Sequence, residues 1–438
     1  MQIKLEPLQR FSGSVTVPGD KSISHRALIL GSIAQGETRI SNLLESGDVR
    51  STEECLLRLG IEIFRKSSTV LIRGRGLHGL KAPSEVLDCG NSGTTLRLLM
   101  GLLSGQPFKS TLTGDESLRC RPMKRIADPL REMGAKICLS GNEFAPLEIQ
   151  GATLKGLDFQ LSIASAQLKT ALLLAGLSAE GVTRLRSKIG SRDHTERMLP
   201  MFGVQLDYLK KNLCSNDSPD SIDSTVELSI RGGSPLFGTE LKVPGDPSSA
   251  AFWMAGACLV PKGRVEIKNV LINPTRIGFV NVLKRMGAKI SITMTSNEFE
   301  PVGDILVSHS RLIGVQVKNE EISSLIDELP LLGVLATQAH GVTEVRGAEE
   351  LRVKECDRIE ALATNLRSMG VVIETYPDGF RIEGPQKLKG AKIQSFSDHR
   401  IAMSFAIASC IADGETVIEG TECVQISYPG FFDRLASL

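Results

Sequence analysis

The sequence predicts an α/β (α+β) protein of two similar domains, each containing three β/α modules of about 75 residues. Three observations carry this prediction. One glycine opens a strand-like run six times along the chain, a second glycine ends a helix-like run five times, and the tetrapeptide Val-Pro-Gly-Asp occurs twice.

The two glycine series keep step with each other through the chain. A glycine after a run of apolar helical period is the expected helix end, because glycine adopts the left-handed conformation without steric cost. Alternating or β-branched residues follow each glycine and predict a strand. The first series is Gly36, Gly105, Gly181, Gly263, Gly341 and Gly414, and the second is Gly60, Gly134, Gly203, Gly287 and Gly370.

The repeated Val-Pro-Gly-Asp divides the modules into two groups of three. The copies occupy residues 17–20 and 243–246. The simplest division makes residues 20–245 one domain and residues 1–19 with 246–438 the other, with hinges near 18–20 and 244–246. Pro-Gly is also a common turn signal, so both copies being ordinary turns stays open.

Polar residues precede a strongly apolar helix in every module. Ser, Asn and Asp at such places are normally N-caps, and this explains Ser248 and Ser249. Basic residues in a first turn oppose the helix dipole, so Arg26, Lys169 and Arg400 indicate bound anions. The polar groups at the helix starts are Ser22, Ser24, His25, Arg26, Asn91, Ser92, Thr94, Arg97, Ser165, Gln167, Lys169, Ser248, Ser249, Asp327, Glu328, Asp398, His399 and Arg400.

Basic loops at matching places in several modules strengthen the expectation of an anion site. A single basic loop is usually solvated surface, but recurrence favours a shared cleft between the domains for phosphates or carboxylates. Acids among these cations are either salt-bridge partners or groups for proton transfer. The cations are Arg119, Arg121, Lys124, Arg125, Arg192, Lys354 and Arg358, and the acids are Asp327, Glu328 and Glu355.

The composition narrows the class of protein. Lys and Arg number 51 against 50 Asp and Glu, which gives no overall attraction to nucleic acid or membrane. The N-terminus does not have the pattern of a signal peptide, and apolar runs stay below the roughly 18 residues of a membrane span. Nine scattered cysteines without a C-x-x-C pair suit a reducing cytoplasm. We expect a cytoplasmic monomer that uses small-molecule substrates and needs no metal or cofactor.

Several stretches together identify a resemblance. They are PGDKSISHRALIL from Pro18, CGNSGTTLRLL from Cys89, SLRCRPMKR from Ser117, SAQLKTALLLA from Ser165, SRDHTERML from Ser191, VPGDPSSAAF from Val243, DELPLL from Asp327, RVKECDRI from Arg352 and DHRIAMSF from Asp398. With them the whole chain resembles the EPSP synthase family of enolpyruvyl transferases, of bacterial type. The resemblance implies two domains of three βαβαββ units, described as an inside-out α/β barrel, with the active site in the interdomain cleft.

The resemblance also implies a reaction and its residues. The 5-hydroxyl of shikimate 3-phosphate attacks C2 of phosphoenolpyruvate, and a tetrahedral ketal then loses phosphate. Catalysis falls to Asp327 and Glu355, with help from Lys21. The residues implied to bind phosphoenolpyruvate are Lys21, Asn91, Gly93, Arg121, Gln167, Arg358 and Arg400. The residues implied to bind shikimate 3-phosphate are Lys21, Ser22, Arg26, Ser165, Ala166, Gln167, Arg192, Asp327 and Lys354.

Two departures and two alternatives stay open. Many relatives have PGSKS where this chain has Asp20, which would weaken anion binding or cap a helix, and Ile426 stands where many relatives carry a lysine. A sister enolpyruvyl transferase acts on UDP-N-acetylglucosamine and uses a loop cysteine, for which Cys120 is the candidate. The other alternative is a non-catalytic anion-binding protein on the same fold.

Overall fold

The computed structural model describes residues 1–438 except 67, 163, 189–190 and 215–221. The chain divides into two compact units. Unit 1 consists of Met1–Asp20 and Pro244–Leu438, and unit 2 consists of Lys21–Val243. The chain therefore leaves unit 1 after Asp20 and returns to it at Pro244.

One sheet pattern recurs through both units. In unit 2, β6 (Leu87–Asp88) runs parallel to β7 (Lys109–Thr113). Both β7 and β8 (Lys136–Ser140) pair antiparallel with β9 (Phe144–Gln150). One helix separates β6 from β7, and a short helix followed by a longer one separates β7 from β8, so the order along the chain is βαβαββ when the helical segments are taken together.

Unit 2 contains this pattern three times. In the second sheet, β11 runs parallel to β13, and both β13 and β14 are antiparallel to β15. In the third sheet, β16 runs parallel to β3, and both β3 and β4 are antiparallel to β5. Strand β16 completes the first repeat from the far end of the unit, because it is later in the chain than its partners. The bounds are β11 Asp158–Leu161, β13 Val182–Lys188, β14 Leu206–Cys214, β15 Ile222–Arg231, β16 Glu240–Lys242, β3 Gln35–Ser41, β4 Glu62–Lys66 and β5 Thr69–Arg75.

Unit 1 repeats the pattern in two four-stranded sheets, and its third sheet has three strands; two of these sheets combine strands from both chain segments. The N-terminal β2 runs parallel to β17, and β1 pairs antiparallel with β25. The sheets have the orders β18-β19-β17-β2, β20-β21-β23-β22 and β1-β25-β24. The bounds are β1 Gln2–Leu5, β2 Ser12–Thr16, β17 Arg264–Leu271, β18 Lys289–Asn297, β19 Pro301–Ser308, β20 Gln316–Val317, β21 Gly341–Val345, β22 Glu374–Tyr376, β23 Gly379–Gly384, β24 Lys392–Gln394 and β25 Thr416–Glu419.

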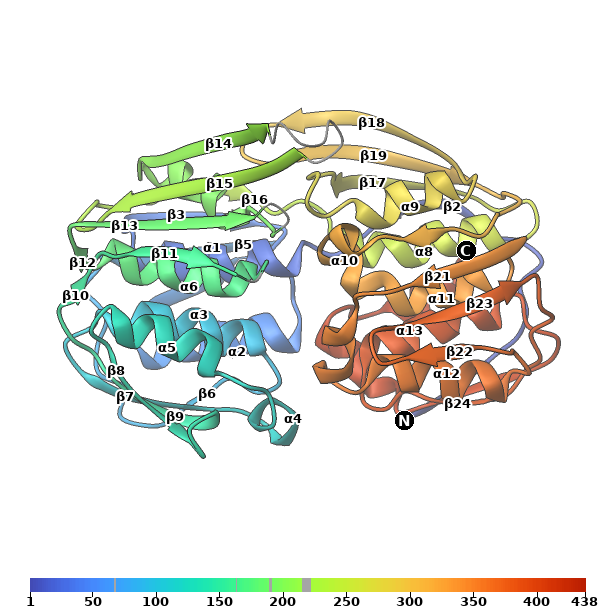
Figure 1. Ribbon diagram of the computed structural model, residues 1–438, viewed down its shortest axis with the longest axis horizontal. Coiled ribbons are helices and arrows are strands. Elements are labelled where there is room, and N and C mark those ends of the chain that lie inside the picture. Colours follow the sequence, from blue (N-terminus) through green and yellow to red (C-terminus); the bar gives the residue numbers. More distant parts are fainter. Residues whose placement is uncertain (67, 163, 189–190, 215–221) are drawn as a thin grey trace. The chain divides into compact units, whose positions relative to one another are not determined.

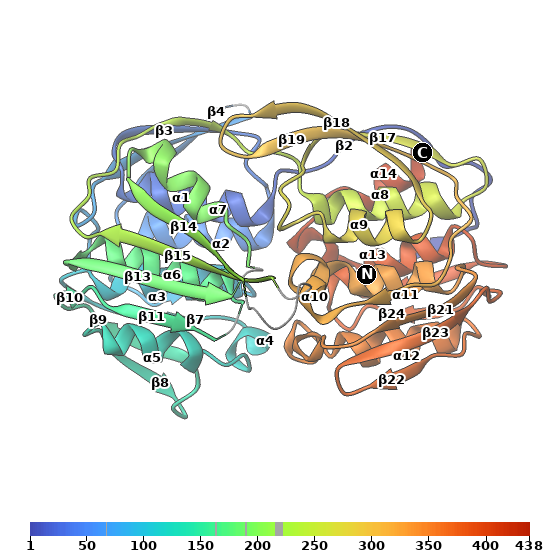
Figure 2. The ribbon, with the colours of Figure 1, turned by 45° about the horizontal axis from the view of Figure 1, so that its top comes forward.

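Three apolar helices lie inside each unit, and the sheets lie outside them (Figures 1 and 2). These are the helices that open each module, and nearly every residue beyond their first turn is buried. In unit 2, α3 and α6 pack so closely that a Cβ on Gly101 would meet the Ala171 carbonyl oxygen at 2.2 Å. The inner helices are α1 Lys21–Ile33, α3 Gly93–Ser104, α6 Ala166–Leu177, α8 Pro247–Leu259, α11 Leu329–Ala336 and α13 His399–Ser409.

The second helices of the modules carry polar residues on one side. They are shorter than the first helices in the modules that begin with α1, α3, α6 and α8, whereas the second helix Arg358–Ser368 has 11 residues and α11 has 8. The second helices are α2 Gly47–Arg58, α5 Lys124–Glu132, α7 His194–Met198, α9 Gly278–Arg285 and α12 Arg358–Ser368. Shorter helices α4 (Glu116–Arg119), α10 (Asn319–Leu325) and α14 (Phe431–Ala436) complete the set used below. The mixture confirms the predicted α/β class. Within the described ranges, every helix falls short of the length and apolarity that crossing a membrane requires.

The glycines follow the prediction in one series and only partly in the other. The series that ends the second helices has positive φ throughout, at Gly60 (83°), Gly134 (113°), Gly203 (81°), Gly287 (87°) and Gly370 (85°). In the first series, Gly105 has φ −95°, and the left-handed residue before β17 is Lys262 rather than Gly263. Glycine is required at those two places by close packing, since a Cβ on Gly263 would meet the Ala257 carbonyl oxygen at 2.4 Å.

Candidate active site

The first cluster of predicted site residues in unit 2 lies at the start of α1. Lys21 opens the helix, and its Nζ lies 3.0 Å from Oδ2 of Asp48 in α2. The Ser22 hydroxyl accepts a long hydrogen bond of 3.5 Å from Nη1 of Arg192. Lys21 and Arg192 both remain partly exposed, so each presents a cation at the helix start.

Arg26 lies one turn further along α1 and is buried. Its Nε donates to Oγ1 of Thr195 (2.7 Å), its Nη2 donates to Oγ1 of Thr170 (2.8 Å), and its Nη1 donates to the Ser22 carbonyl oxygen (2.9 Å). All three acceptors are neutral oxygens, and together these bonds fix the orientation of the guanidinium. They also join α1 to α6 and α7, which gives Arg26 a structural role in addition to any binding role.

Lys169 differs from the expectation that it binds an anion. The side chain is buried in α6 and forms an ion pair of 2.5 Å with Glu196 of α7, which is also buried. A lysine in the first turn of a helix therefore gains its stabilisation here from a carboxylate of the protein itself. Its position at a helix start could not reveal that partner.

The second cluster of unit 2 joins the starts of α3 and α6. Ser92 and Ser165 are the N-caps, as their sequence positions predicted. Gln167 follows Ala166 in the first turn of α6, and its Oε1 accepts 2.8 Å from Nη1 of Arg97. Its Nε2 donates to Oγ1 of Thr94 at 3.1 Å. The amide of Gln167 in α6 is therefore held in one orientation by two side chains of α3.

Two arginines meet at Gly93, the first residue of α3. A Cβ at Gly93 would lie 2.9 Å from Nη1 of Arg97 and 3.5 Å from Nη1 of Arg121. Arg121 also donates from Nη2 to Oδ1 of Asn91 at 3.2 Å, and Asn91 in turn donates to Asp115 at 2.7 Å. The start of α3 therefore carries two guanidiniums at the positive end of the helix dipole, an arrangement suited to an anion.

In unit 1 one arginine organises the predicted proton-transfer groups. Arg358 opens α12 and is 1% exposed. Its Nη1 lies 3.3 Å from Oδ1 of Asp327, and its Nη2 lies 2.7 Å from Oε2 of Glu355. Asp327 and Glu355 keep 18% and 15% of their side chains exposed. Two carboxylates that solvent or a ligand can reach are thus fixed by the same buried cation.

A third acid holds Arg358 from the buried side. Oδ2 of Asp398 accepts 2.7 Å from Nε of Arg358, and Oδ1 accepts from the backbone N of Arg400 at 2.8 Å. Asp398 therefore caps α13 and orients Arg358 with the same side chain. Burial alone would lower the pKa of Arg358, but the charges of Asp398, Glu355 and Asp327 raise it above the ordinary value.

Arg400 and Lys354 complete the cluster in unit 1. Nη2 of Arg400 lies 3.8 Å from Oδ2 of Asp327, and Nη1 lies 3.6 Å from Oε1 of Glu328. Nζ of Lys354 lies 3.8 Å from Oε2 of Glu350. The structure therefore joins Asp327, Glu355, Arg358 and Arg400 in one cluster of ion pairs.

The two Val-Pro-Gly-Asp copies meet in unit 1. Gly19 and Gly245 form an antiparallel bridge, the Asp20 N–H donates to the Pro244 carbonyl (2.8 Å), and the Asp246 N–H donates to the Pro18 carbonyl (2.8 Å). Both aspartates reach Arg276, which is 3% exposed in its side chain. Nη1 lies 2.6 Å from Oδ2 of Asp20, and Nη2 lies 3.2 Å from Oδ1 of Asp246.

This pairing corrects the expectation for Ser248 and Ser249. The N-cap of α8 is Asp246, whose Oδ1 accepts from the Ser248 N–H at 2.7 Å. Ser248 instead lies in the first turn, and its hydroxyl accepts from Nη2 of Arg276 at 3.1 Å. Ser249 is buried in the same turn. A serine next to a stronger cap was therefore mistaken for the cap itself.

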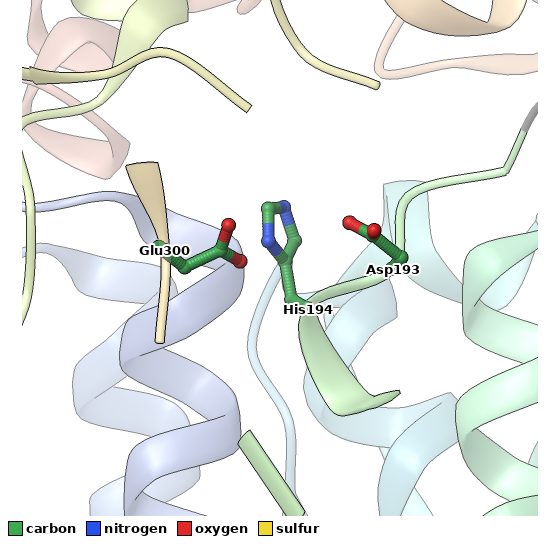
Figure 3. A group of neighbouring side chains, drawn as sticks. All are labelled: Asp193, His194 and Glu300. Atoms are coloured by element: carbon green, nitrogen blue, oxygen red, sulfur yellow. The ribbon is translucent and has the colours of Figure 1, made fainter. Parts of the chain in front are cut away.

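The loop that carries Arg192 continues into α7. Figure 3 shows the side chains of Asp193 and His194 leaving consecutive positions at the start of this helix. Asp193 forms an ion pair of 2.8 Å with Arg197, one turn later. The figure also labels Glu300 of unit 1, whose carboxylate accepts from Nδ2 of Asn273 at 2.7 Å.

Comparison with known proteins decides the family. The sequence profile described as EPSP synthase (3-phosphoshikimate 1-carboxyvinyltransferase) matches residues 5–435.

The chain belongs to the EPSP synthase family.

Individual relatives within the EPSP synthase family agree over the full length. The chain is 48% identical to a 3-phosphoshikimate 1-carboxyvinyltransferase of Bacillus cytotoxicus over 431 residues, 98% of each chain. It is 46% identical to that of Bacillus subtilis over 439 residues, 100% of this chain and 99% of the relative. A solved EPSP synthase from Acinetobacter baumannii superposes with a TM-score of 0.84 at 42% identity, covering 100% of this chain and 97% of that one.

Against the EPSP synthase pattern, Asp20 now has a structural explanation. The residue is fully buried, and its carboxylate pairs with Arg276 instead of facing solvent at the start of α1. Ile426 ends a short 3-10 helix, Thr421–Ile426, and is partly buried against the core of unit 1.

Four residues of these clusters had no role in the sequence-based expectation. Arg97 and Asp398 stood among the polar groups at helix starts, which was a usable signal. Asp48 lies in the first turn of α2, where an acid is common, so its position gave only a weak signal. Arg276 precedes α9 in an ordinary loop, and nothing in its neighbourhood in the sequence pointed to the two aspartates it binds.

Proposed function

We propose that this chain transfers the enolpyruvyl group of phosphoenolpyruvate to the 5-hydroxyl of shikimate 3-phosphate and releases phosphate. The names of full-length relatives support this reaction. The structural observation that carries the proposal is the pair of accessible carboxylates, Asp327 and Glu355, fixed by the buried Arg358.

We assign the binding of phosphoenolpyruvate to cations and amides at helix starts. Arginine suits both the phosphate and the carboxylate of this substrate, because its planar fork binds two oxygens at once. The pairing of Arg97 and Arg121 across Gly93 supports an anion position beside α3. The assigned residues are Lys21, Asn91, Gly93, Arg121, Gln167, Arg358 and Arg400.

We assign shikimate 3-phosphate mainly to the starts of α1 and α6. Ser22, Arg26 and Arg192 are joined by hydrogen bonds there, and Ser165 and Ala166 begin α6. A phosphate would receive both a helix N-terminus and nearby guanidiniums. The assigned residues are Lys21, Ser22, Arg26, Ser165, Ala166, Gln167, Arg192, Asp327 and Lys354.

The two acids divide the proton transfers. One carboxylate accepts the proton of the 5-hydroxyl while the hydroxyl oxygen attacks C2 of phosphoenolpyruvate. An acid delivers a proton to C3, and the product of this addition is the tetrahedral ketal. Removing a proton from the new methyl group then expels phosphate and restores the carbon–carbon double bond. We place Asp327 and Glu355 in these roles, with Lys21 assisting, because Arg358 holds both carboxylates in fixed positions.

Both units supply residues to the proposed reaction. We propose that the units are the two domains of the enzyme and that the chain bends near 18–20 and 244–246 when substrates bind, which would exclude water. We further propose that the chain acts as a cytoplasmic monomer on small-molecule substrates, and its scattered cysteines are consistent with a reducing compartment. Light scattering of the purified protein would give its mass in solution.

The test is phosphate release from phosphoenolpyruvate with and without shikimate 3-phosphate. We expect release only when both substrates are present. Glu355→Ala should lower kcat by about a hundredfold or more, which is the usual contribution of a general acid or base. Glu360→Gln is the matched control: its carboxylate is exposed, pairs with Arg367, and lies in the same helix as Arg358.

The outcome also separates the alternatives. Release with UDP-N-acetylglucosamine but not with shikimate 3-phosphate would assign the chain to the sister reaction. Binding of both substrates, seen by titration calorimetry, without any release would indicate a non-catalytic protein. Wild-type rates in Glu355→Ala would remove Glu355 from the catalytic groups while leaving the reaction in place.

A further inference from the structure

Glu328 is a buried acid next to the predicted site that none of the assigned roles uses. It ends the short 3-10 helix Ile326–Glu328, directly before α11, and it follows Asp327 in the chain. The residue is 5% exposed. A glutamate is rarely buried to this extent unless its charge has a partner or a task.

The side chain of Glu328 faces Arg400 on one side. Its Oε1 lies 3.6 Å from Nη1 of Arg400, while Nη2 of the same guanidinium lies 3.8 Å from Oδ2 of Asp327. The two acids are consecutive in sequence and attract opposite ends of one cation. The position of the guanidinium therefore depends on the balance between them.

The start of α8 lies on the other side of Glu328. The Ser248 hydroxyl there accepts from Nη2 of Arg276 at 3.1 Å, and the charge of Arg276 also acts on the carboxylate of Glu328. Arg276 is anchored by Asp20 and Asp246. Burial raises the pKa of Glu328, the charge of Arg400 opposes this rise, and the charge of Asp327 adds to it. Glu328 thus connects the anchored Arg276 cluster to Arg400 within unit 1.

This arrangement is poor for stability alone. Oε1 of Glu328 is buried without a hydrogen-bond donor among the described residues, and its ion pair with Arg400 is long. A buried carboxylate with such a contact is usually less stabilising than an apolar side chain of the same volume. The contact to Arg400 supplies a reason for the charge at this position.

We infer that Glu328 is a positioning residue that holds Nη1 of Arg400, keeps this guanidinium from closing onto Asp327, and so presents it to the anion of phosphoenolpyruvate. This inference rests on the proposed function. Glu328 does not itself touch substrate in this role. Without its charge, Arg400 retains Asp327 as its acidic partner and moves toward it, because the opposing attraction is gone.

The test compares Glu328→Gln with the wild-type protein and with Glu321→Gln. Glutamine keeps the approximate volume of glutamate and removes its charge, while one acceptor oxygen becomes an N–H donor. Glu321→Gln removes a charge from the Arg285–Glu321 pair of the same unit, at 2.9 Å, so it controls for loss of an ion pair. We expect Glu328→Gln to raise KM for phosphoenolpyruvate about tenfold while KM for shikimate 3-phosphate stays within about twofold.

Two further measurements exclude a merely structural role. Glu328→Asp retains the charge and should recover most of the lost affinity, although its side chain is shorter. The side-chain NMR signal of Arg400, assigned by its loss in Arg400→Lys, should shift in Glu328→Gln and stay in place in Glu321→Gln. Equal rises in both KM values together with a lower melting temperature would overturn the inference. An unchanged or lower KM for phosphoenolpyruvate would also overturn it.

Direct titration separates this inference from the proposed reaction. Phosphoenolpyruvate is titrated into wild-type protein and Glu328→Gln in the presence of shikimate 3-phosphate, where binding is measured whether or not turnover occurs. Absence of phosphate release by the wild type refutes the proposed function. Weaker binding by the variant still supports the role of Glu328, whereas equal binding, or no binding by the wild type, rejects it.

Discussion

Replacing Asp20 by asparagine removes one charge from the Arg276 cluster and preserves the shape of the side chain. Arg276 is buried, and Asp20 supplies its shorter carboxylate contact, at 2.6 Å. Burial alone would lower the pKa of Arg276, but Asp20 and then Asp246 raise it above the ordinary value. The charge of Asp20 is therefore one of the main compensations for a cation held away from water.

The size of the effect follows from these contacts. Removing one partner of a buried ion pair typically costs about 3–5 kcal/mol, because the remaining charge stays buried. Asp246 still lies 3.2 Å from Nη2, so we expect the lower end, about 3 kcal/mol. For a domain of roughly 150–250 residues this corresponds to a fall in melting temperature of about 6–12 °C.

Differential scanning calorimetry measures this change in the transition that belongs to unit 1. Asp20→Asn combined with Arg276→Met should recover part of the loss, because methionine removes the buried cation whose shorter carboxylate contact asparagine has taken away. Glu374→Gln breaks an exposed pair with Arg381 in the same unit and should shift the transition by less than about 2 °C. A melting temperature of Asp20→Asn within 2 °C of wild type would refute the reasoning.

Three further predictions concern unit 2. Gly93→Ala should raise KM for phosphoenolpyruvate about tenfold with little change in melting temperature. The reason is that the new methyl group would displace Arg97 from Gln167. An unchanged KM in steady-state assays would contradict this prediction. Burial, followed by the charges of Lys21 and Arg26, lowers the pKa of His25 well below its ordinary value. Its contribution to stability is therefore complete above about pH 6.5 and falls by up to about 1.4 kcal/mol per pH unit below it, so His25→Asn should show a weaker decline in acid melting curves than wild type. Cys120→Ser should keep wild-type phosphate release, and its complete inactivation would instead favour the sister reaction.

The periodic part of the fold was readable from the sequence. Glycine ends helices at Gly60, Gly134 and its counterparts because the backbone there needs positive φ, which is a local requirement. Gly105 and Gly263 look the same in sequence but serve close packing. Contacts between distant segments decide that difference, so local patterns do not contain it.

The site was readable in its residue types but not in its pairings. Helix-start positions drew attention to Asp327 and Arg400, and the recurring basic loops drew attention to Arg358; both arginines contact Asp327 in unit 1. The sharing of Arg358 among three acids requires Asp398, which comes 40 residues later. Arg276 binds an aspartate 256 residues away. Pairings at such separations depend on how the modules pack, and a single sequence does not reveal them. The assigned substrate contacts stay predictions.

The two segments that connect the units, near Asp20 and Pro244, are hydrogen-bonded to each other, and this determines how the units could be separated by deletion. Asp20 and Pro244 are hydrogen-bonded neighbours, so residues 21–243 are an insertion into unit 1, which we call the host. The chain leaves the host and returns to it at adjacent points. A short turn joining these two neighbours would close the host over the excised insertion. Deleting the first 20 residues would be far more damaging, because it would strip β1 from β25 and β2 from β17. Unit 2 is thus a single uninterrupted stretch of chain, whereas unit 1 needs residues from both sides of that stretch to complete its sheets.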